Sequence, residues 1–234
     1  MPDMARPLSA LERGVALLGR VVFRSLTRVK VEGFDGLPKS GPLIVVANHL
    51  SNADPPIVGG WLLKGLGRPV SFLAKSALFV GPVGDLLRAH EMIMVRSGGS
   101  DIDAYRQARA VLDAGGVICI FPEGTRSRTG ALIEAKQGVV VLAARSGAPV
   151  LPIGVSGTDR FLSPESRLPR VGARVTVRAG RPFQVDLPRR ATRDQIAAAT
   201  DDLMGRIAAL IEPRHRGRYA LVQAGAAPPR AGAR

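Results

Sequence analysis

The chain has 234 residues, which is long enough for one domain with a substantial buried core. A hydrophobic content of 46% argues against global disorder, and a net charge of +14 favours anionic partners such as nucleic acid, anionic lipid or phosphorylated substrates. Because only 4% of the residues are aromatic, there is little material for stacking bases, so a membrane surface or a phosphate ligand is favoured over nucleic acid.

The first predicted element is an amphipathic helix over residues 8–28. Its apolar residues recur at three- and four-residue spacing: Leu8, Leu11, Val15, Leu18, Val22 and Leu26. Its arginines fall on the opposite side: Arg13, Arg20, Arg24 and Arg28. Residues 1–28 are therefore interpreted as a helix lying in a membrane interface. The alternative is a surface helix that packs its apolar stripe on its own domain.

From residue 29 onward, strand and helix patterns alternate. Strands are predicted at 29–34, 42–48, 69–75, 91–96, 116–121, 148–157 and 173–180. Helices are predicted at 55–66, 77–89, 100–115, 138–147 and 192–211. This order predicts an α/β domain over 29–212, with a mixed, mainly parallel sheet flanked by helices.

The chain outside this domain is predicted to contain neither a signal peptide nor a spanning segment. No stretch approaches the roughly 20 apolar residues that cross a bilayer, and no cleavage site follows the N-terminus. Residues 213–234 carry five arginines and no acid among Gly, Ala and Pro, so they are predicted to form a disordered basic tail. We expect a peripheral protein on the cytoplasmic face of the cell membrane.

The stretch "VVANHLSNADPP" holds both asparagines of the chain. The strand ends at Ala47, and Asp54 followed by two prolines is typical of a helix start, so Asp54 is a candidate cap. The intervening loop carries His49. A histidine oriented by Asp54 through one ring nitrogen would keep the other nitrogen available as a base, although this spacing also arises by chance.

The stretch "FPEGTRS" at 121–127 also follows an apolar strand, so both loops are expected at one edge of the sheet. Glu123 and Arg126 could form a surface salt bridge of little energetic weight. Alternatively, Arg126 binds a phosphate oxygen while Glu123 orients Arg126 or a substrate hydroxyl.

Together these two stretches resemble the glycerolipid acyltransferase family, and most closely its 1-acylglycerol-3-phosphate O-acyltransferases. The pattern Asn-His-x-Ser-x-x-Asp is matched by Asn48, His49, Ser51 and Asp54, and Phe-Pro-Glu-Gly-Thr-Arg-Ser is matched in full. Two weaker blocks correspond to "HEMIMVR", ending in Arg96, and to "APVLPIGVSGT" with Pro152. The resemblance covers roughly residues 30–185. In the second block, His90 stands where glycine is usual, and Val95 where an acidic or polar residue often precedes the arginine.

The resemblance implies transfer of a fatty acyl group from coenzyme A or acyl carrier protein to the hydroxyl of lysophosphatidic acid, giving phosphatidic acid. His49 would be the general base and Asp54 its orienting partner, without an acyl-enzyme, metal or other cofactor. The substrate-binding residues would be Glu123, Gly124, Thr125, Arg126, Arg96 and Lys75. The partners would be the thioester donor, the lipid acceptor and an anionic membrane, and no nucleic acid.

Two alternatives remain open from the sequence. One is an acyltransferase of the same superfamily with another lysophospholipid or a glycolipid as acceptor. The other is a non-catalytic basic module that binds membranes or nucleic acid, which would explain the charge but not the two polar loops.

Overall fold

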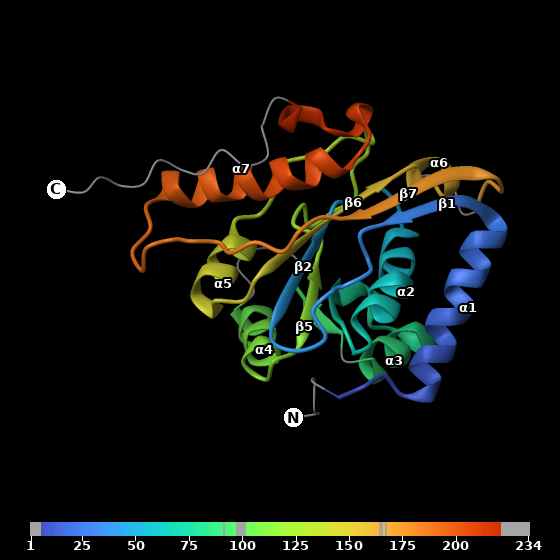
Figure 1. Cartoon of the computed structure of the whole chain (residues 1–234), viewed down its shortest axis with the longest axis horizontal. Coiled ribbons are helices and arrows are strands. Elements are labelled where there is room, and N and C mark those ends of the chain that lie inside the picture. Colours follow the sequence, from blue (N-terminus) through green and yellow to red (C-terminus); the bar gives the residue numbers. More distant parts are fainter. Residues whose placement is uncertain (1–5, 91, 97–101, 164–165, 167, 221–234) are drawn as a thin grey trace.

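A mixed seven-stranded sheet organises the part of the chain that the computed structural model describes, residues 6–90, 92–96, 102–163, 166 and 168–220. The strands are β1 (Thr27–Glu32), β2 (Leu43–Ala47), β3 (Ser71–Lys75), β4 (Ile93–Val95), β5 (Val117–Ile120), β6 (Val150–Ser156) and β7 (Ala173–Ala179). Their spatial order is β1-β7-β6-β2-β5-β3-β4 (Figure 1). The five strands from β6 to β4 are parallel, whereas β7 is antiparallel to β6 and parallel to β1. The predicted fold class is confirmed.

Helices cover both faces of this sheet. They are α1 (Ala10–Leu26), α2 (Asp54–Leu66), α3 (Gly81–Ala89), α4 (Ile102–Asp113), α5 (Gly138–Ser146), α6 (Thr158–Phe161) and α7 (Arg193–Leu210). Figure 1 shows α1 and α2 on one side of the sheet and α4, α5 and α7 on the other.

Strand β2 shows why both faces need cover. All five of its residues are buried; Val45 packs in the core under α2, and its neighbour Val46 packs in the core under α5 and α7. Successive side chains of a strand point to opposite faces, so a strand that is apolar throughout must be covered twice. The core is therefore divided into two layers by the sheet.

Helix α1 packs on α2 through Ala16 and Arg20 and on the core through Phe23 and Leu26, and it leaves Leu11, Leu17 and Leu18 exposed. Ala16 is buried, Arg20 donates to the carbonyl of Gly60 at 2.8 Å, and the Arg24 guanidinium lies 6.0 Å from the Trp61 ring centroid. The exposed large residues of α1 are Leu11 (72%), Val15, Leu17, Leu18 (64%), Val21 and Val22. The two ends of the predicted stripe, Leu8 and Leu26, pack on the domain, whereas its middle is exposed. The alternative that the stripe packs on its own domain is therefore wrong for the middle of the stripe. None of the helices in the described residues combines the length and the hydropathy that a bilayer crossing demands.

The segment after α7 is ordered where the sequence predicted disorder. It forms two 3-10 turns, η2 (Pro213–His215) and η3 (Gly217–Tyr219), and both His215 and Tyr219 are buried. Nδ1 of His215 donates to the carbonyl of Gly130, and the backbone N–H of Leu132 donates to the carbonyl of His215 at 2.7 Å. The prediction of a disordered tail is wrong for residues 213–220, because two buried rings outweigh the arginine-rich composition. The rest of the predicted tail, 221–234, lies outside the described residues.

Candidate active site

The two polar loops lie side by side at one edge of the sheet. β2 and β5 are parallel neighbours with Val46 paired to Ile120, so the loops that follow them leave the sheet together. The imidazole of His49 stacks on the Phe121 ring, with centroids 4.4 Å apart and an interplanar angle of 28°. The backbone N–H of Ser127 donates to the carbonyl of His49 at 2.9 Å. The predicted common edge is confirmed, and the loops contact each other through both side chains and backbone.

His49 and Asp54 form a hydrogen-bonded pair. Nδ1 of His49 lies 2.9 Å from Oδ2 of Asp54, which also accepts the backbone N–H groups of Leu50 (2.6 Å) and Ser51 (2.7 Å). Asp54 is completely buried in the first turn of α2, where the helix dipole favours a negative charge. Since a carboxylate only accepts, the neutral imidazole carries its proton on Nδ1 and leaves Nε2 as the acceptor.

Asn48 and Ser51 hold the backbone of this loop in place. The Asn48 amide donates to the carbonyl of Val155 at 2.9 Å, and its oxygen accepts the N–H of the same residue at 2.7 Å. Because Val155 lies in β6, which pairs with β2, the side chain extends the ladder between the two strands beyond Ala47. The Ser51 hydroxyl donates to the carbonyl of Leu162 at 2.7 Å. These side chains fix the position from which His49 projects.

Glu123 braces the loops instead of pairing with Arg126. One carboxylate oxygen accepts the backbone N–H of His49 at 2.8 Å, and the other accepts that of Ile133 at 3.1 Å. Burial raises the pKa of Glu123 to about 7; the two backbone hydrogen bonds act in the opposite direction, and the nearby Asp54 adds to the rise. The expected pairing with Arg126, as a surface salt bridge or as an orienting contact, is therefore wrong, because the carboxylate is turned under the His49 loop.

Gly124, Thr125 and Arg126 are less buried than Glu123. Thr125 is exposed, and Arg126 is half-buried and makes no hydrogen bond or ion pair with another described residue. Gly124 has a left-handed backbone, with φ +65°, and the aliphatic stem of Lys136 lies directly against it. The sequence reading missed Lys136. Its separation of 13 residues from Glu123 follows no periodic pattern, so only the fold brings it here.

Lys75 and Arg96 reach the same sheet edge further along. Lys75 is the exposed last residue of β3, and Arg96 follows β4, which pairs with β3 through Lys75 and Val95. In the order of the sheet, Lys75 lies one strand and Arg96 two strands beyond β5. Neighbouring strands are roughly 4.8 Å apart. Arg96 forms an exposed ion pair with Asp103 at 3.3 Å. The fold places both cations at this edge but farther from His49 than Arg126.

The described residues offer neither a cysteine nucleophile nor a metal site. Cys119 is completely buried in β5, and burial raises the pKa of its thiol, so it is not available as a nucleophile. Among the described residues, no cluster of three or more histidine, cysteine or carboxylate side chains is arranged to hold a metal ion.

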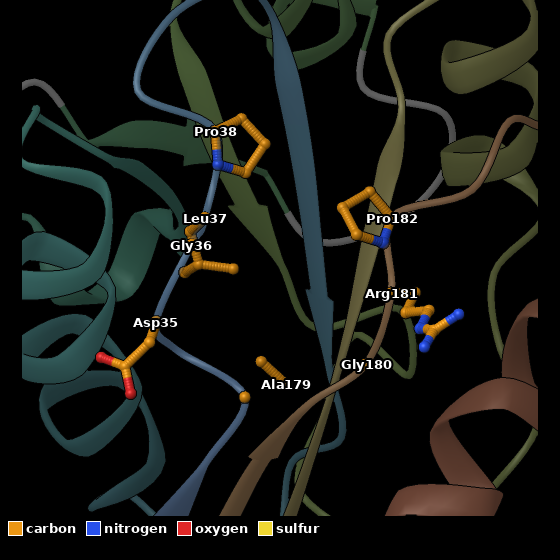
Figure 2. A pocket seen from close by; sticks show the side chains of 9 residues that line it. Asp35, Gly36, Leu37, Pro38, Ala179, Gly180, Arg181 and Pro182 are labelled. Carbon is orange, nitrogen blue, oxygen red and sulfur yellow. The ribbon is translucent and has the colours of Figure 1, made fainter.

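A groove of about 430 Å³ lies at the opposite edge of the sheet, where β1 and β7 end (Figure 2). It is lined by Gly33, by residues 35–38 and by residues 179–182. Its two charged side chains, Asp35 and Arg181, point away from each other in Figure 2. Because no functional groups converge there and none of the predicted site residues lines it, the candidate site is the His49 edge.

Comparison with known proteins agrees with this geometry. A family model described as Acyltransferase matches residues 28–156, more than half of the chain. The 1-acyl-sn-glycerol-3-phosphate acyltransferase LPAT1 of Arabidopsis thaliana is 31% identical over 139 residues, covering 58% of this chain and 38% of that protein. The 1-acyl-sn-glycerol-3-phosphate acyltransferase of Borreliella burgdorferi is 33% identical over 137 residues, covering 57% and 53%. The chain thus spans between about two fifths and half of the length of these relatives.

A solved structure shares both the fold and part of the sequence. The crystal structure of the 1-acyl-sn-glycerophosphate (LPA) acyltransferase PlsC from Thermotoga maritima matches with a TM-score of 0.65 and 27% identity. The match covers 82% of this chain and 76% of that one. The family match, which includes both loops of the candidate site, and this structural likeness lead to one conclusion: the chain belongs to the acyltransferase family.

Proposed function

We propose that the protein transfers a fatty acyl group from an acyl thioester to the free hydroxyl of 1-acylglycerol-3-phosphate, giving phosphatidic acid. The observation that carries this proposal is the pairing of His49 with the buried Asp54, which leaves Nε2 as the free acceptor of a partly exposed ring. A hydroxyl is a weak nucleophile at neutral pH and needs such a base as it attacks. The names of the relatives support this acceptor.

The proposed reaction proceeds without an acyl-enzyme. Nε2 of His49 takes the proton of the acceptor hydroxyl while its oxygen bonds to the thioester carbonyl carbon, whose oxygen becomes an oxyanion. The intermediate collapses, the carbon–sulfur bond breaks, and the imidazolium returns its proton to the departing thiolate. Asp54 stabilises the imidazolium and holds its orientation throughout. Coenzyme A and acyl carrier protein both present the required thioester.

Arg126 is the first candidate for binding the acceptor's phosphate. Its guanidinium has no counter-ion among the described residues, and it follows Glu123, which touches the His49 backbone. A guanidinium matches the geometry of phosphate oxygens. Lys75 and Arg96, farther along the same edge, would extend the positive field toward the approaching anionic lipid.

The exposed leucines of α1 support docking on a membrane surface. They form an uncovered apolar face on a chain of net charge +14, a combination suited to an anionic bilayer. We place the protein peripherally on the cytoplasmic face of the cell membrane, where an amphiphilic acceptor resides.

The decisive experiment measures acyl transfer from a long-chain acyl-CoA to lysophosphatidic acid by the parent protein, His49→Ala and the control His90→Ala. His90 is a partly exposed histidine outside both loops. Product from the parent and His90→Ala but not from His49→Ala supports the reaction, the acceptor and the base. Full activity in His49→Ala contradicts the mechanism. A folded parent that makes no product with acyl-CoA is tested again with an acyl carrier protein thioester; no product with either donor contradicts this acceptor and directs the search to other hydroxyl-bearing lipids.

A further inference from the structure

The side chain of Lys136 packs against the turn that carries Glu123 and Gly124. A Cβ atom placed on Gly124 would lie 2.8 Å from Cε and 3.3 Å from Nζ of Lys136, so the lysine stem occupies the space that the glycine leaves open. The base of Lys136 is held as well, because its backbone N–H donates to the carbonyl of Pro122 at 2.8 Å. The ammonium group is therefore kept beside the active-site turn, although the residue is exposed.

The protein supplies no anion to this ammonium group within its described residues. The side chain of Lys136 makes no hydrogen bond or ion pair there, and Glu134, two residues away, is paired with Arg218 at 3.6 Å. Glu123 is adjacent, but both of its oxygens accept backbone N–H groups. Arg126, on the same turn, is also without a counter-ion in the described structure. Lys136 thus lies against Gly124, and Arg126 follows this glycine by two residues. An anion from outside the chain would balance their charges.

We propose that Lys136 binds a phosphate group of a substrate, acting with Arg126 across the Gly124 turn. A lysine binds phosphate as a point charge, and the contact of its stem with Gly124 places the ammonium group near the turn. This assignment builds on the proposed acyl transfer. The phosphate has two possible sources, the phosphomonoester of the lipid acceptor and the phosphates of a coenzyme A donor, and the chemistry of the contact is the same for both.

The test compares Lys136→Met and Lys136→Arg with the control Lys64→Met. Lys64 is an exposed lysine ten residues after Asp54 in α2, about 15 Å along the helix from the site, and its replacement removes the same charge. With lysophosphatidic acid and acyl-CoA, we expect kcat/KM to fall about 10- to 100-fold in Lys136→Met. The value of kcat/KM for Lys136→Arg should stay within about threefold of the parent, since this variant keeps a cation at the same position. Unchanged melting temperatures would show that all variants fold.

Substitute substrates distinguish the two sources of phosphate. If Lys136 binds the acceptor, the defect of Lys136→Met disappears with a monoacylglycerol, which lacks the phosphate. If it binds the donor, the defect persists with monoacylglycerol but disappears with an acyl N-acetylcysteamine thioester, which lacks the nucleotide. A Lys136→Met variant that matches Lys64→Met within about twofold on every substrate pair overturns the assignment.

A binding measurement separates this assignment from the proposed reaction. Calorimetric titration of the parent, Lys136→Met and Lys64→Met with coenzyme A and with a short-chain lysophosphatidic acid needs no turnover. At least tenfold weaker binding of one ligand by Lys136→Met alone supports the phosphate site, even if the acceptor proposed above proves wrong. Equal affinities in all three proteins, or no binding of either ligand by the parent, overturn it.

Discussion

The carboxylate of Glu123 accepts the backbone N–H of His49 at 2.8 Å, so the two polar loops are joined beneath the candidate base. Its second oxygen accepts the N–H of Ile133, which ties the downstream segment 130–133 to the same point. That segment in turn contacts the C-terminal turns through Leu132 and His215. The position of His49 therefore depends on contacts from three separated parts of the chain.

Replacing Glu123 by Gln should impair both activity and stability. An amide has one acceptor oxygen, so one of the two backbone N–H groups loses its partner inside the protein, which costs about 1–3 kcal/mol. We expect activity to fall at least tenfold and the melting temperature to drop by several degrees. Glu134→Gln, at an exposed position, is the matched control. A fully active, equally stable Glu123→Gln protein would show that the two hydrogen bonds of the Glu123 carboxylate have no effect on the site or the fold.

The raised pKa of Glu123 predicts a specific pH dependence of folding. Since this pKa rises from its ordinary value of 4.5 to about 7, the folded state binds more protons than the unfolded state between these values. The contribution of Glu123 to stability must therefore decrease as the pH rises from about 4.5 to 7, by on the order of 3 kcal/mol. Denaturant unfolding of the parent and Glu123→Gln at pH 5 and pH 8 checks this. Parallel changes in the two proteins would contradict it.

Replacing Asp54 by Asn should reduce turnover far more than substrate affinity. The uncharged amide no longer stabilises an imidazolium and can favour the wrong tautomer of His49, so we expect kcat to fall about 10²- to 10⁴-fold with a modest change in KM. Asp113→Asn, in an exposed ion pair with Arg109, is the control. A loss confined to KM would assign Asp54 to acceptor binding instead of base orientation.

The apolar face of α1 predicts membrane affinity that is separable from folding. Leu11→Asp combined with Leu18→Asp should reduce binding to anionic phospholipid vesicles by at least tenfold, because a buried leucine contributes about 1.5–3 kcal/mol. Thermal stability should remain unchanged, since both side chains are mostly exposed. The control Ile102→Asp changes an exposed apolar residue at the start of α4, under the other face of the sheet. Equal vesicle binding by all three proteins would exclude α1 as the docking surface.

Two truncations distinguish the ordered C-terminal turns from the residues that follow them. A chain ending at Ala220 should keep its activity and melting temperature. A chain ending at Ile211 loses the buried His215 and Tyr219 and frees the loop at 130–132, so it should melt several degrees lower and lose activity. Melting temperature and acyl-transfer activity are measured for both truncated chains and the parent. Equal behaviour of the two truncations would show that the turns do not support the site.

Most regular elements and the edge of the sheet that carries the site could be predicted from the sequence alone. The short α6 was not predicted, and β1 begins at Thr27, inside the predicted helix 8–28. The run "LIVVA" in β2 is apolar at every position, which identifies a strand covered on both faces, and the Asp-Pro-Pro sequence identifies the start of α2. Because parallel strands end at the same edge, the loops after β2 and β5 were expected there, whereas the order of the sheet makes the two strands neighbours. These inferences depend on local patterns and on general rules of sheet geometry.

The tertiary structure alone decided what the polar side chains contact. Glu123 and Arg126 are close in sequence, yet the carboxylate turns under His49, because backbone N–H groups from two other segments need acceptors there. The side of α1 that packs was also undetermined by its pattern: close approach at Gly60 selects Ala16 and Arg20 and leaves Leu11, Leu17 and Leu18 exposed. Lys136 and His215 reach their places through contacts between distant segments. The sequence by itself determined the elements and the shared edge, whereas only packing between segments far apart in the chain decided these contacts.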